Sequence, residues 1–117
     1  PVKWMLSRGY EKNVVVLTRD VKYRKKANPK MQLFLKAVLH KYPAFLKDLE
    51  ERHIHYNETL EELASLEKEG RIHIIRPSSP IQAAMIERDE SNLERIYQTG
   101  RADMKKDLEK LKAYLDS

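Results

Sequence analysis

Two short runs of aliphatic residues constrain the fold of this chain more than any other feature. Residues 14–17 read VVVL and residues 72–75 read IHII. The first run is apolar on both faces, which is typical of a parallel strand buried between two layers. Because a long stretch of helical pattern separates the runs, we predict strands over residues 13–18 and 71–76 that pair in parallel as a βαβ unit.

Proline and glycine positions predict where the first helices begin and end. Residues 1–8 have helical spacing, with Pro1 suited to a first turn and Gly9 to a left-handed cap. Further along, Asn28 and Pro29 offer an N-cap and a first helical residue. We therefore expect a short helix, the first strand, the basic loop and a new helix, in that order.

Two consecutive helices are predicted next. The first covers residues 30–42, and the second starts at Pro43, which cannot continue the first. Gly70 stops the second helix at about residue 69. The positions expected on the apolar sides of these helices are Met31, Leu35, Val38, Leu39, Tyr42, Phe45, Leu49, Tyr56, Leu60, Leu63 and Leu66.

The last third of the chain is predicted to hold a turn at residues 77–80 and then two helices. Ser91-Asn-Leu-Glu94 matches a capping box, which opens a helix to about Thr99. Gly100 separates it from a last helix, so all three glycines fall where we expect helices to end. The apolar stripe of the last helix is Met104, Leu108, Leu111 and Leu115.

The net charge of +5 comes from one loop. Residues 19–30 carry six basic side chains and one acidic side chain, while the other residues carry 17 of each sign. A single basic segment argues for one local contact with an anionic partner. The candidate contact residues are Lys22, Arg24, Lys25, Lys26 and Lys30.

Three interpretations of this basic segment stay open. The simplest is a solvated loop. Contact with anionic lipid is the second, since each basic residue near such a surface contributes about 1 kcal/mol. Nucleic-acid binding is the third, but Tyr23 is the one aromatic residue of the segment and no nucleic-acid-binding motif is present. The segment leaves the carboxyl end of the first strand, an edge where open α/β sheets form sites, and this favours lipid over nucleic acid.

The histidines do not form a metal-binding pattern. His53 and His55 are two residues apart and therefore lie on different faces of a helix, whereas a helical metal pair needs a spacing of three or four. The chain has no HExxH motif and no cysteine. We predict no metal and no cofactor. We interpret His40, His53, His55 and His73 as partly exposed polar residues, and Glu58, Glu61 and Glu62 as a solvated charged face.

Length and composition indicate one globular domain or a piece of one. The chain has 117 residues, of which 41% are hydrophobic and 35% charged. No apolar run approaches the ~18 residues needed to span a bilayer, and no signal peptide is visible. The chain begins with Pro1 rather than methionine, so we expect further residues upstream.

Several motifs together resemble the C-terminal region of bacterial patatin-like phospholipases. PVKWMLSRG at residues 1–9 and NVVVLTR at residues 13–19 resemble the segment after the catalytic aspartate of that family. The resemblance covers essentially the whole chain, in order and at family-like spacing. Its further elements are Tyr23-Arg-Lys-Lys26, Arg52-His53, Tyr56-Asn57-Glu58-Thr59-Leu60, Ile74-Ile-Arg-Pro77, Glu87-Arg88, Leu93, Tyr97, Gly100 and Ala102-Asp103.

The resemblance implies a serine–aspartate dyad hydrolase of lipid esters. The fold class would be α/β. This chain would be a helix-rich fragment with two parallel strands, and it would form the C-terminal part of a patatin-type three-layer α/β/α fold. Residues 1–80 would end the α/β domain and residues 81–117 would form a helical subdomain. The family's nucleophile sits in a G-x-S-x-G elbow, which this sequence lacks, and the catalytic aspartate would fall just before Pro1. We therefore assign no catalytic residue, and we predict that the chain alone is inactive.

Partners and location follow from the same reasoning. In the parent protein the substrate would be a lipid or another ester, and the basic loop with the helix after it would border the opening for the acyl chain. The rival interpretation is that this helix packs in the core. We expect a cytoplasmic protein that can contact an anionic membrane peripherally, and we expect no nucleic-acid partner. Free strand edges can also pair two copies of the chain into a homodimer. The alternative function is a helical interaction module whose basic loop binds an anionic partner.

Overall fold

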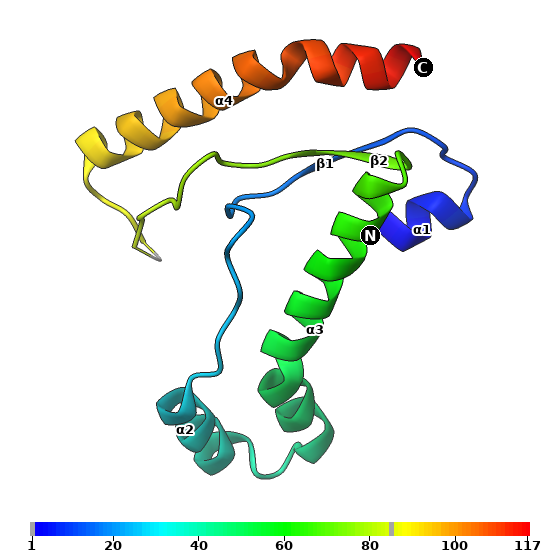
Figure 1. Cartoon of the computed structure of the whole chain (residues 1–117). Coiled ribbons are helices and arrows are strands. Elements are labelled where there is room, and N and C mark those ends of the chain that lie inside the picture. The colour runs from blue at the N-terminus through cyan, green and yellow to red at the C-terminus, as the bar shows by residue number, and fades with distance from the viewer. Residues whose placement is uncertain (1, 85) are drawn as a thin grey trace. The chain divides into compact units, whose positions relative to one another are not determined.

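The computed structural model describes residues 2–84 and 86–117. Four helices and two strands lie in these residues (Figure 1). The prediction for Pro1 as a first-turn residue lies outside the described part of the chain. The elements are α1 (Val2–Ser7), β1 (Asn13–Val16), α2 (Pro29–Leu39), α3 (Pro43–Lys68), β2 (Ile72–Ile75) and α4 (Glu90–Asp116).

The two strands pair in parallel, as predicted, so the chain is a helix-rich α/β structure. Asn13 is opposite Ile72 and Val16 is opposite Ile75. Leu17 extends the ladder, because its N–H donates to the carbonyl oxygen of Ile75 at 2.8 Å. The connection from β1 to β2 passes through α2 and α3, as a parallel pair requires.

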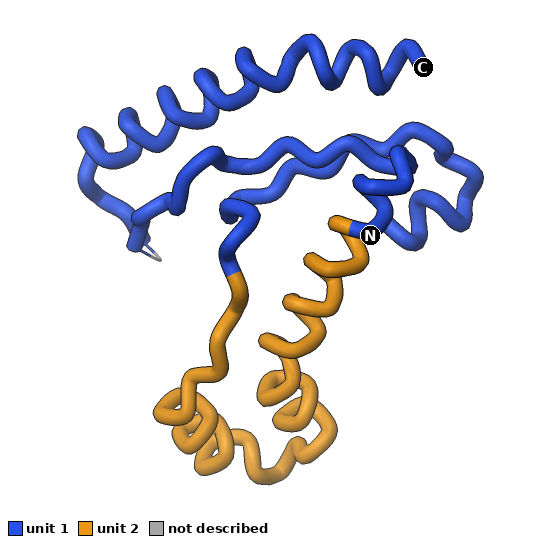
Figure 2. The backbone as a smooth tube through the Cα atoms, in the orientation of Figure 1, with its two compact units in different colours: residues 1–23, 65–117 blue, residues 24–64 orange. Residues whose placement is uncertain are grey.

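The described chain forms two compact units (Figure 2). The first unit combines residues 1–23 with residues 65–117, and the second holds residues 24–64. The first unit therefore contains α1, both strands and α4, and the second contains α2 and most of α3. The predicted boundary at residue 80 concerns the proposed parent fold and stays a prediction.

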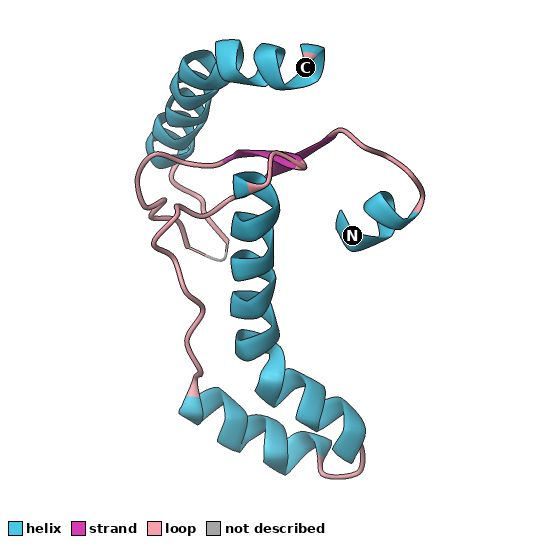
Figure 3. Cartoon of the chain, turned by 45° about the vertical axis from the view of Figure 1, so that its right-hand side comes forward, coloured by secondary structure: helices cyan, strands magenta, loops and turns pink. Residues whose placement is uncertain are grey.

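In the first unit, α1 and α4 lie on opposite sides of the strand pair (Figures 1 and 3). Ile72 and Ile74 are buried, while His73 and Ile75 point to the other face of β2. The α4 side of the sheet is the His73 side, since Asp107 of α4 contacts the His73 ring.

The prediction that β1 is buried on both faces is wrong for this chain. Val14 is 40% exposed and Val16 is 70% exposed. The buried residue of β1 is Asn13, whose side-chain amide donates to the Tyr10 carbonyl oxygen at 2.7 Å. The reason is that α4 packs on β2, on the face of the sheet that carries His73. Val14 and Val16 of β1 lie on the same face, and α4 leaves them exposed.

Two of the three glycines follow a helix end in a left-handed conformation, as predicted. Gly9 and Gly70 have φ angles of 83° and 73°, in the left-handed region where glycine avoids the cost of a Cβ atom. Each follows the end of a helix, α1 and α3 respectively.

The prediction of two C-terminal helices is wrong. α4 runs unbroken from Glu90 to Asp116 through Gly100, because a glycine costs a helix interior only about 1 kcal/mol and flanking packing offsets this. The prediction that a capping box at Ser91 begins this helix is also wrong. The N-cap is Asp89, whose carboxylate accepts from the backbone N–H groups of Ser91 and Asn92.

In the second unit, local signals define the helix starts. The Asn28 side chain accepts from the Met31 N–H at 3.1 Å, and Pro29 is the first residue of α2. Pro43 starts α3, as predicted. Within α3, the Thr59 hydroxyl donates to the His55 carbonyl oxygen one turn earlier.

The apolar stripes predicted for α2 and α3 are only partly buried. In α3, Leu63 is buried, and Leu49, Tyr56, Leu60 and Leu66 are half-buried. In α2, no residue is buried, so the interpretation that α2 is a core helix receives no support within the described residues. No helix in residues 2–84 and 86–117 is long and apolar enough to cross a membrane.

Candidate functional site

The predicted basic residues are divided between the two units. Lys22 belongs to the first unit, where its N–H donates to Oδ1 of Asp20 at 2.9 Å in a tight turn. The other four basic residues belong to the second unit, and of these only Lys25 is half-buried. Those four residues are Arg24, Lys25, Lys26 and Lys30.

The side-chain amide of Asn57 holds the basic segment against α3. Its Oδ1 atom accepts from the Lys25 N–H at 2.8 Å, and its Nδ2 atom donates to the Lys25 carbonyl oxygen at 3.0 Å. Both backbone polar groups of Lys25 are therefore satisfied by one side chain. The ammonium group of Lys25 lies 5.4 Å from the ring centroid of Tyr56, a cation–π contact.

We call these two hydrogen bonds between Asn57 and Lys25 the Asn57 clamp. The clamp determines which basic side chains of the segment are exposed to solvent. Successive side chains of an extended backbone point to opposite sides, and the burial pattern follows this alternation. Lys25 is half-buried beside Tyr56, whereas Arg24 and Lys26 on either side of it are exposed. The segment therefore presents charge outward while its backbone is fixed.

A shallow groove of 170 Å³ lies beside this segment within the second unit. Lys25, Lys26 and Asn28 form one border, Gln32 and Leu35 of α2 a second, and α3 the third. The remaining lining residues are Ala27, Met31, Leu49, Glu50, Arg52 and His53. The mixture of basic and apolar groups suits an anion with an apolar part.

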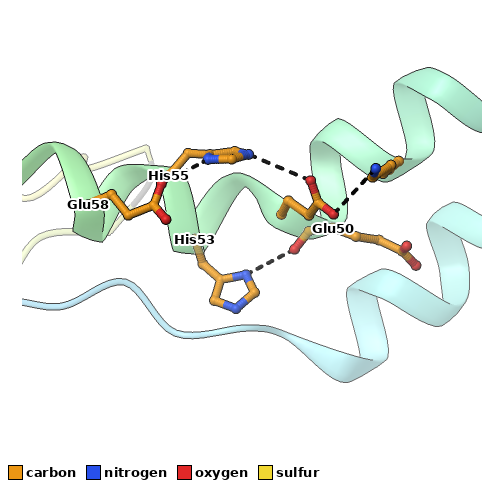
Figure 4. Close-up of polar contacts among 6 residues, drawn as sticks. Glu50, His53, His55 and Glu58 are labelled. Atoms are coloured by element: carbon orange, nitrogen blue, oxygen red, sulfur yellow. Dashed lines mark hydrogen bonds and ion pairs between the residues drawn. The ribbon is translucent and has the colours of Figure 1, made fainter.

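The two neighbouring histidines of α3 point to different sides of the helix, as predicted (Figure 4). His53 donates from Nδ1 to the Glu50 carbonyl oxygen at 2.9 Å. His55 lies 3.1 Å from Glu58 and 3.6 Å from Glu51. The hydrogen bond with Glu58 raises the pKa of His55 above its ordinary value. Among the described residues no three His, Asp or Glu side chains gather as a metal site requires.

A second candidate site lies at the carboxyl ends of the strands in the first unit. A cavity of 390 Å³ is lined mainly by apolar groups of β1, β2 and α4. Its polar lining includes Arg76 and Asp103, and Arg76 is paired with Glu67. The other lining residues are Val16, Leu17, Thr18, Ile75, Pro77, Ile81, Ile96, Thr99, Gly100 and Met104.

One wall of this cavity is fixed by Asp103. The Ser78 N–H donates to Oδ2 of Asp103 at 2.9 Å, which ties the turn after β2 to α4. This hydrogen bond lowers the pKa of Asp103 below its ordinary value of 3.8. The segments after both strands meet on this side, because Arg19 donates to the Ile81 carbonyl oxygen at 3.3 Å. Ser78 therefore lies at the same sheet edge as the start of the basic segment.

Sequence reasoning missed a polar cluster between the C-terminal half of α4 and the amino-terminal ends of the two strands. Asp107 contacts His73, and the Tyr114 ring stacks on the His73 ring with centroids 5.6 Å apart. The Tyr114 hydroxyl accepts from the Asn13 N–H and donates to the Arg71 carbonyl oxygen, each at 3.0 Å. The expected stripe placed Leu108 and Leu115 inside, but they are 38% and 50% exposed. Met104 and Leu111 of that stripe are half-buried, as predicted, and the polar contacts of Asp107 and Tyr114 complete the face of α4 that packs.

Comparison with known proteins gives one match. The profile of a domain of unknown function, DUF6363, matches residues 42–116. This range covers α3, β2 and α4 completely, and it excludes the basic segment. Neither the curated proteins nor the solved structures yielded a match to the chain.

Proposed function

This chain belongs to the DUF6363 family, a domain of unknown function, and we propose that it is the C-terminal part of a patatin-like lipid acyl hydrolase. The parent reaction would be the hydrolysis of a lipid ester by a serine–aspartate dyad. The proposal starts from the ordered motifs in the sequence, which resemble the region after the catalytic aspartate. In this role the chain completes one side of the sheet and supports the aspartate loop.

The observation that carries the proposal is the open apolar face of β1. Val14 and Val16 are exposed on a strand whose composition is that of a buried parallel strand. A face of this kind is expected where further sheet and helix layers pack. The apolar cavity at the carboxyl ends of β1 and β2 gives additional support, since open α/β sheets form ligand sites at that edge.

Residues 2–84 and 86–117 contain no arrangement that would perform the hydrolysis. Ser7 ends α1, and its hydroxyl donates to the Trp4 carbonyl oxygen at 2.8 Å, as expected of a helix end rather than a nucleophile elbow. Ser78 is bonded to Asp103, but Arg76 and Pro80 stand where a G-x-S-x-G elbow around it would need glycines. The chain alone is therefore predicted to be inactive.

The test compares the 117-residue chain with the full-length protein on a short-chain chromogenic ester. We expect turnover by the full-length protein, loss of turnover when its elbow serine is replaced by alanine, and background rates for the chain. The coding sequence upstream of Pro1 should contain a G-x-S-x-G motif followed by a D-G-G type motif. Turnover by the chain alone, or an upstream sequence without both motifs, would refute the proposal.

A second candidate function is an interaction module that binds an anionic partner. The observation in its favour is the Asn57 clamp, which fixes the backbone of Lys25 and leaves Arg24 and Lys26 exposed. A solvated loop without a partner has no need of such a clamp. This candidate predicts salt-dependent binding by the chain itself, whether or not a parent hydrolase exists.

A further inference from the structure

We propose that α2 is an interfacial helix that docks the second unit onto an anionic lipid bilayer, with Phe34 at the centre of the inserted surface. The inference rests on the proposed function only for the kind of surface, a lipid membrane. It extends that function by naming a docking helix, its orientation and the side chains that enter the bilayer.

The charge distribution of the second unit is the first observation. Residues 24–47 contain seven basic side chains and no acidic one. They extend from the basic segment through α2 to the first turn of α3 and end just before Asp48. A stretch of this length with one sign of charge attracts an anionic surface, and each basic residue near it contributes about 1 kcal/mol. The seven residues are Arg24, Lys25, Lys26, Lys30, Lys36, Lys41 and Lys47.

The second observation is the division of α2 into two sides. Leu35 and Leu39 are half-buried on the side that carries Gln32. Met31, Phe34 and Val38 are 51%, 61% and 57% exposed, and their spacing of three and four places them on one flank. No apolar residue of α2 is buried, although eight of its eleven residues are apolar or proline. We call the surface of Met31, Phe34 and Val38 the apolar flank.

Charge and apolar surface occur side by side on this helix. Lys30 is four residues before Phe34, so it borders the apolar flank at the start of α2. Lys41 is three residues after Val38 and follows the end of α2. An apolar flank bordered by lysines is the pattern of helices that lie in the plane of a membrane, with the apolar side about 5–10 Å deep in the headgroup boundary. A water-exposed helix has no need of three large apolar side chains on one flank.

Exposed aromatic residues follow α2 and extend the apolar surface. Tyr42 is 64% exposed and Phe45 is 55% exposed. Aromatic side chains favour the membrane–water boundary, because they combine an apolar ring with tolerance of nearby polar groups. The ion pair between Lys36 and Glu50, at 3.1 Å, links α2 to α3 and holds the helix at a fixed position in the hairpin.

The experiment measures binding of the 117-residue chain to vesicles of phosphatidylcholine alone and of phosphatidylcholine mixed with phosphatidylserine. We expect binding to the mixed vesicles that weakens as salt rises, and little binding to phosphatidylcholine. The double variant K26E/K30E should bind the mixed vesicles at least about 25-fold more weakly, since each lysine contributes about fivefold. A glutamate at position 30 favours the first turn of α2, so this loss would not come from unfolding.

The matched controls separate docking from general effects. K105E/K110E changes the net charge equally on α4 and should retain most of the binding. Leu33 is 72% exposed, but as the neighbour of Phe34 it points about 100° away from it around the helix and lies outside the apolar flank. Phe34→Gln should weaken binding several-fold, whereas Leu33→Gln should leave it nearly unchanged. Circular dichroism of each variant would show whether its helix content is retained.

Three outcomes would overturn the proposal. The first is equal binding, or no binding, to both vesicle compositions. The second is an equal loss for Phe34→Gln and Leu33→Gln. The third is self-association of the chain that Phe34→Gln abolishes while vesicle binding is unchanged, which would mean that a second copy covers the apolar flank. Vesicle binding requires no turnover, so a failed ester assay with intact binding would refute the hydrolase proposal alone.

Discussion

The Nε2 atom of His73 lies 2.5 Å from Oδ2 of Asp107, across the contact between β2 and α4. The His73 side chain is 14% exposed and the Asp107 side chain 23% exposed. The two residues are 34 positions apart in the chain. Their contact is the central polar link between the strand pair and the C-terminal helix, and the Tyr114 ring stacked on His73 continues it.

Asp107→Ala is expected to lower the free energy of unfolding by about 1–3 kcal/mol, because it leaves the largely buried His73 ring without its acceptor. Urea unfolding followed by circular dichroism would measure the change. Glu109→Gln is the matched control on the same helix. It removes an exposed pair with Lys112 and should change stability by less than about 0.5 kcal/mol. Equal effects of the two variants would contradict a structural role for the His73–Asp107 pair.

Tyr114→Phe should destabilise the chain by about 1–2 kcal/mol while the ring remains stacked on His73. The lost hydroxyl bridges the two strands, accepting from the Asn13 N–H and donating to the Arg71 carbonyl oxygen. Asn13 is buried, so its N–H would lose its partner out of reach of water. Tyr97→Phe, at a position 57% exposed, is the control and should be nearly neutral. Hydrogen exchange at the Asn13 amide should quicken in Tyr114→Phe alone.

Asp103 is expected to make stability depend on pH in the acid range. Its pKa in the folded chain is lowered from 3.8, first by the hydrogen bond from the Ser78 N–H. A lowered folded pKa means that the contribution is fully present above 3.8 and is lost as the pH falls through the folded value. Asp103→Asn should therefore be less stable than the wild type at neutral pH, and the difference should shrink well below pH 3.8. A difference that is constant over this range would contradict the assignment.

Gly100 and Gly70 should respond to alanine in opposite directions. Gly100 lies inside α4, and a Cβ atom there would meet nothing within 4 Å, so Gly100→Ala should stabilise the chain by about 0.5–1 kcal/mol. Gly70 has a φ angle of 73°, where a side chain costs about 1–2 kcal/mol, so Gly70→Ala should destabilise it. Thermal unfolding of the two variants is the measurement. Destabilisation by Gly100→Ala would mean that α4 bends or breaks at this residue.

Local signals predicted most helix and strand boundaries. Asn28, Pro29 and Pro43 start their helices, and Gly9 and Gly70 end theirs, because caps and left-handed turns depend on the residue itself and its nearest neighbours. The parallel pairing of the strands also followed, since a long helical connection permits little else. The resemblance to patatin-like hydrolases and the acyl-chain role of the basic loop stay predictions that await the tests above.

The errors arose where a local signal competed with a longer-range one. A glycine at position 100 and a capping box at Ser91 both suggested helix ends, but α4 continues through the first and is capped by Asp89 before the second. The half-buried residues along α4, including Ile96, Asp103 and Asp107, lie at helical spacing on both sides of the glycine. Packing along the strands outweighs a penalty of about 1 kcal/mol for one glycine.

The sequence by itself determined the first three helices, the two strands, their parallel sense and the position of the excess positive charge. These features depend on residues close together in the chain or on a connection of known length. Only the tertiary structure decided that Asp107 and Tyr114, rather than Leu108 and Leu115, face the sheet, and that Asn57 holds the backbone of Lys25. Such pairs join residues 32 to 101 positions apart, and hydrogen-bond partners at that separation leave no periodic pattern in the sequence.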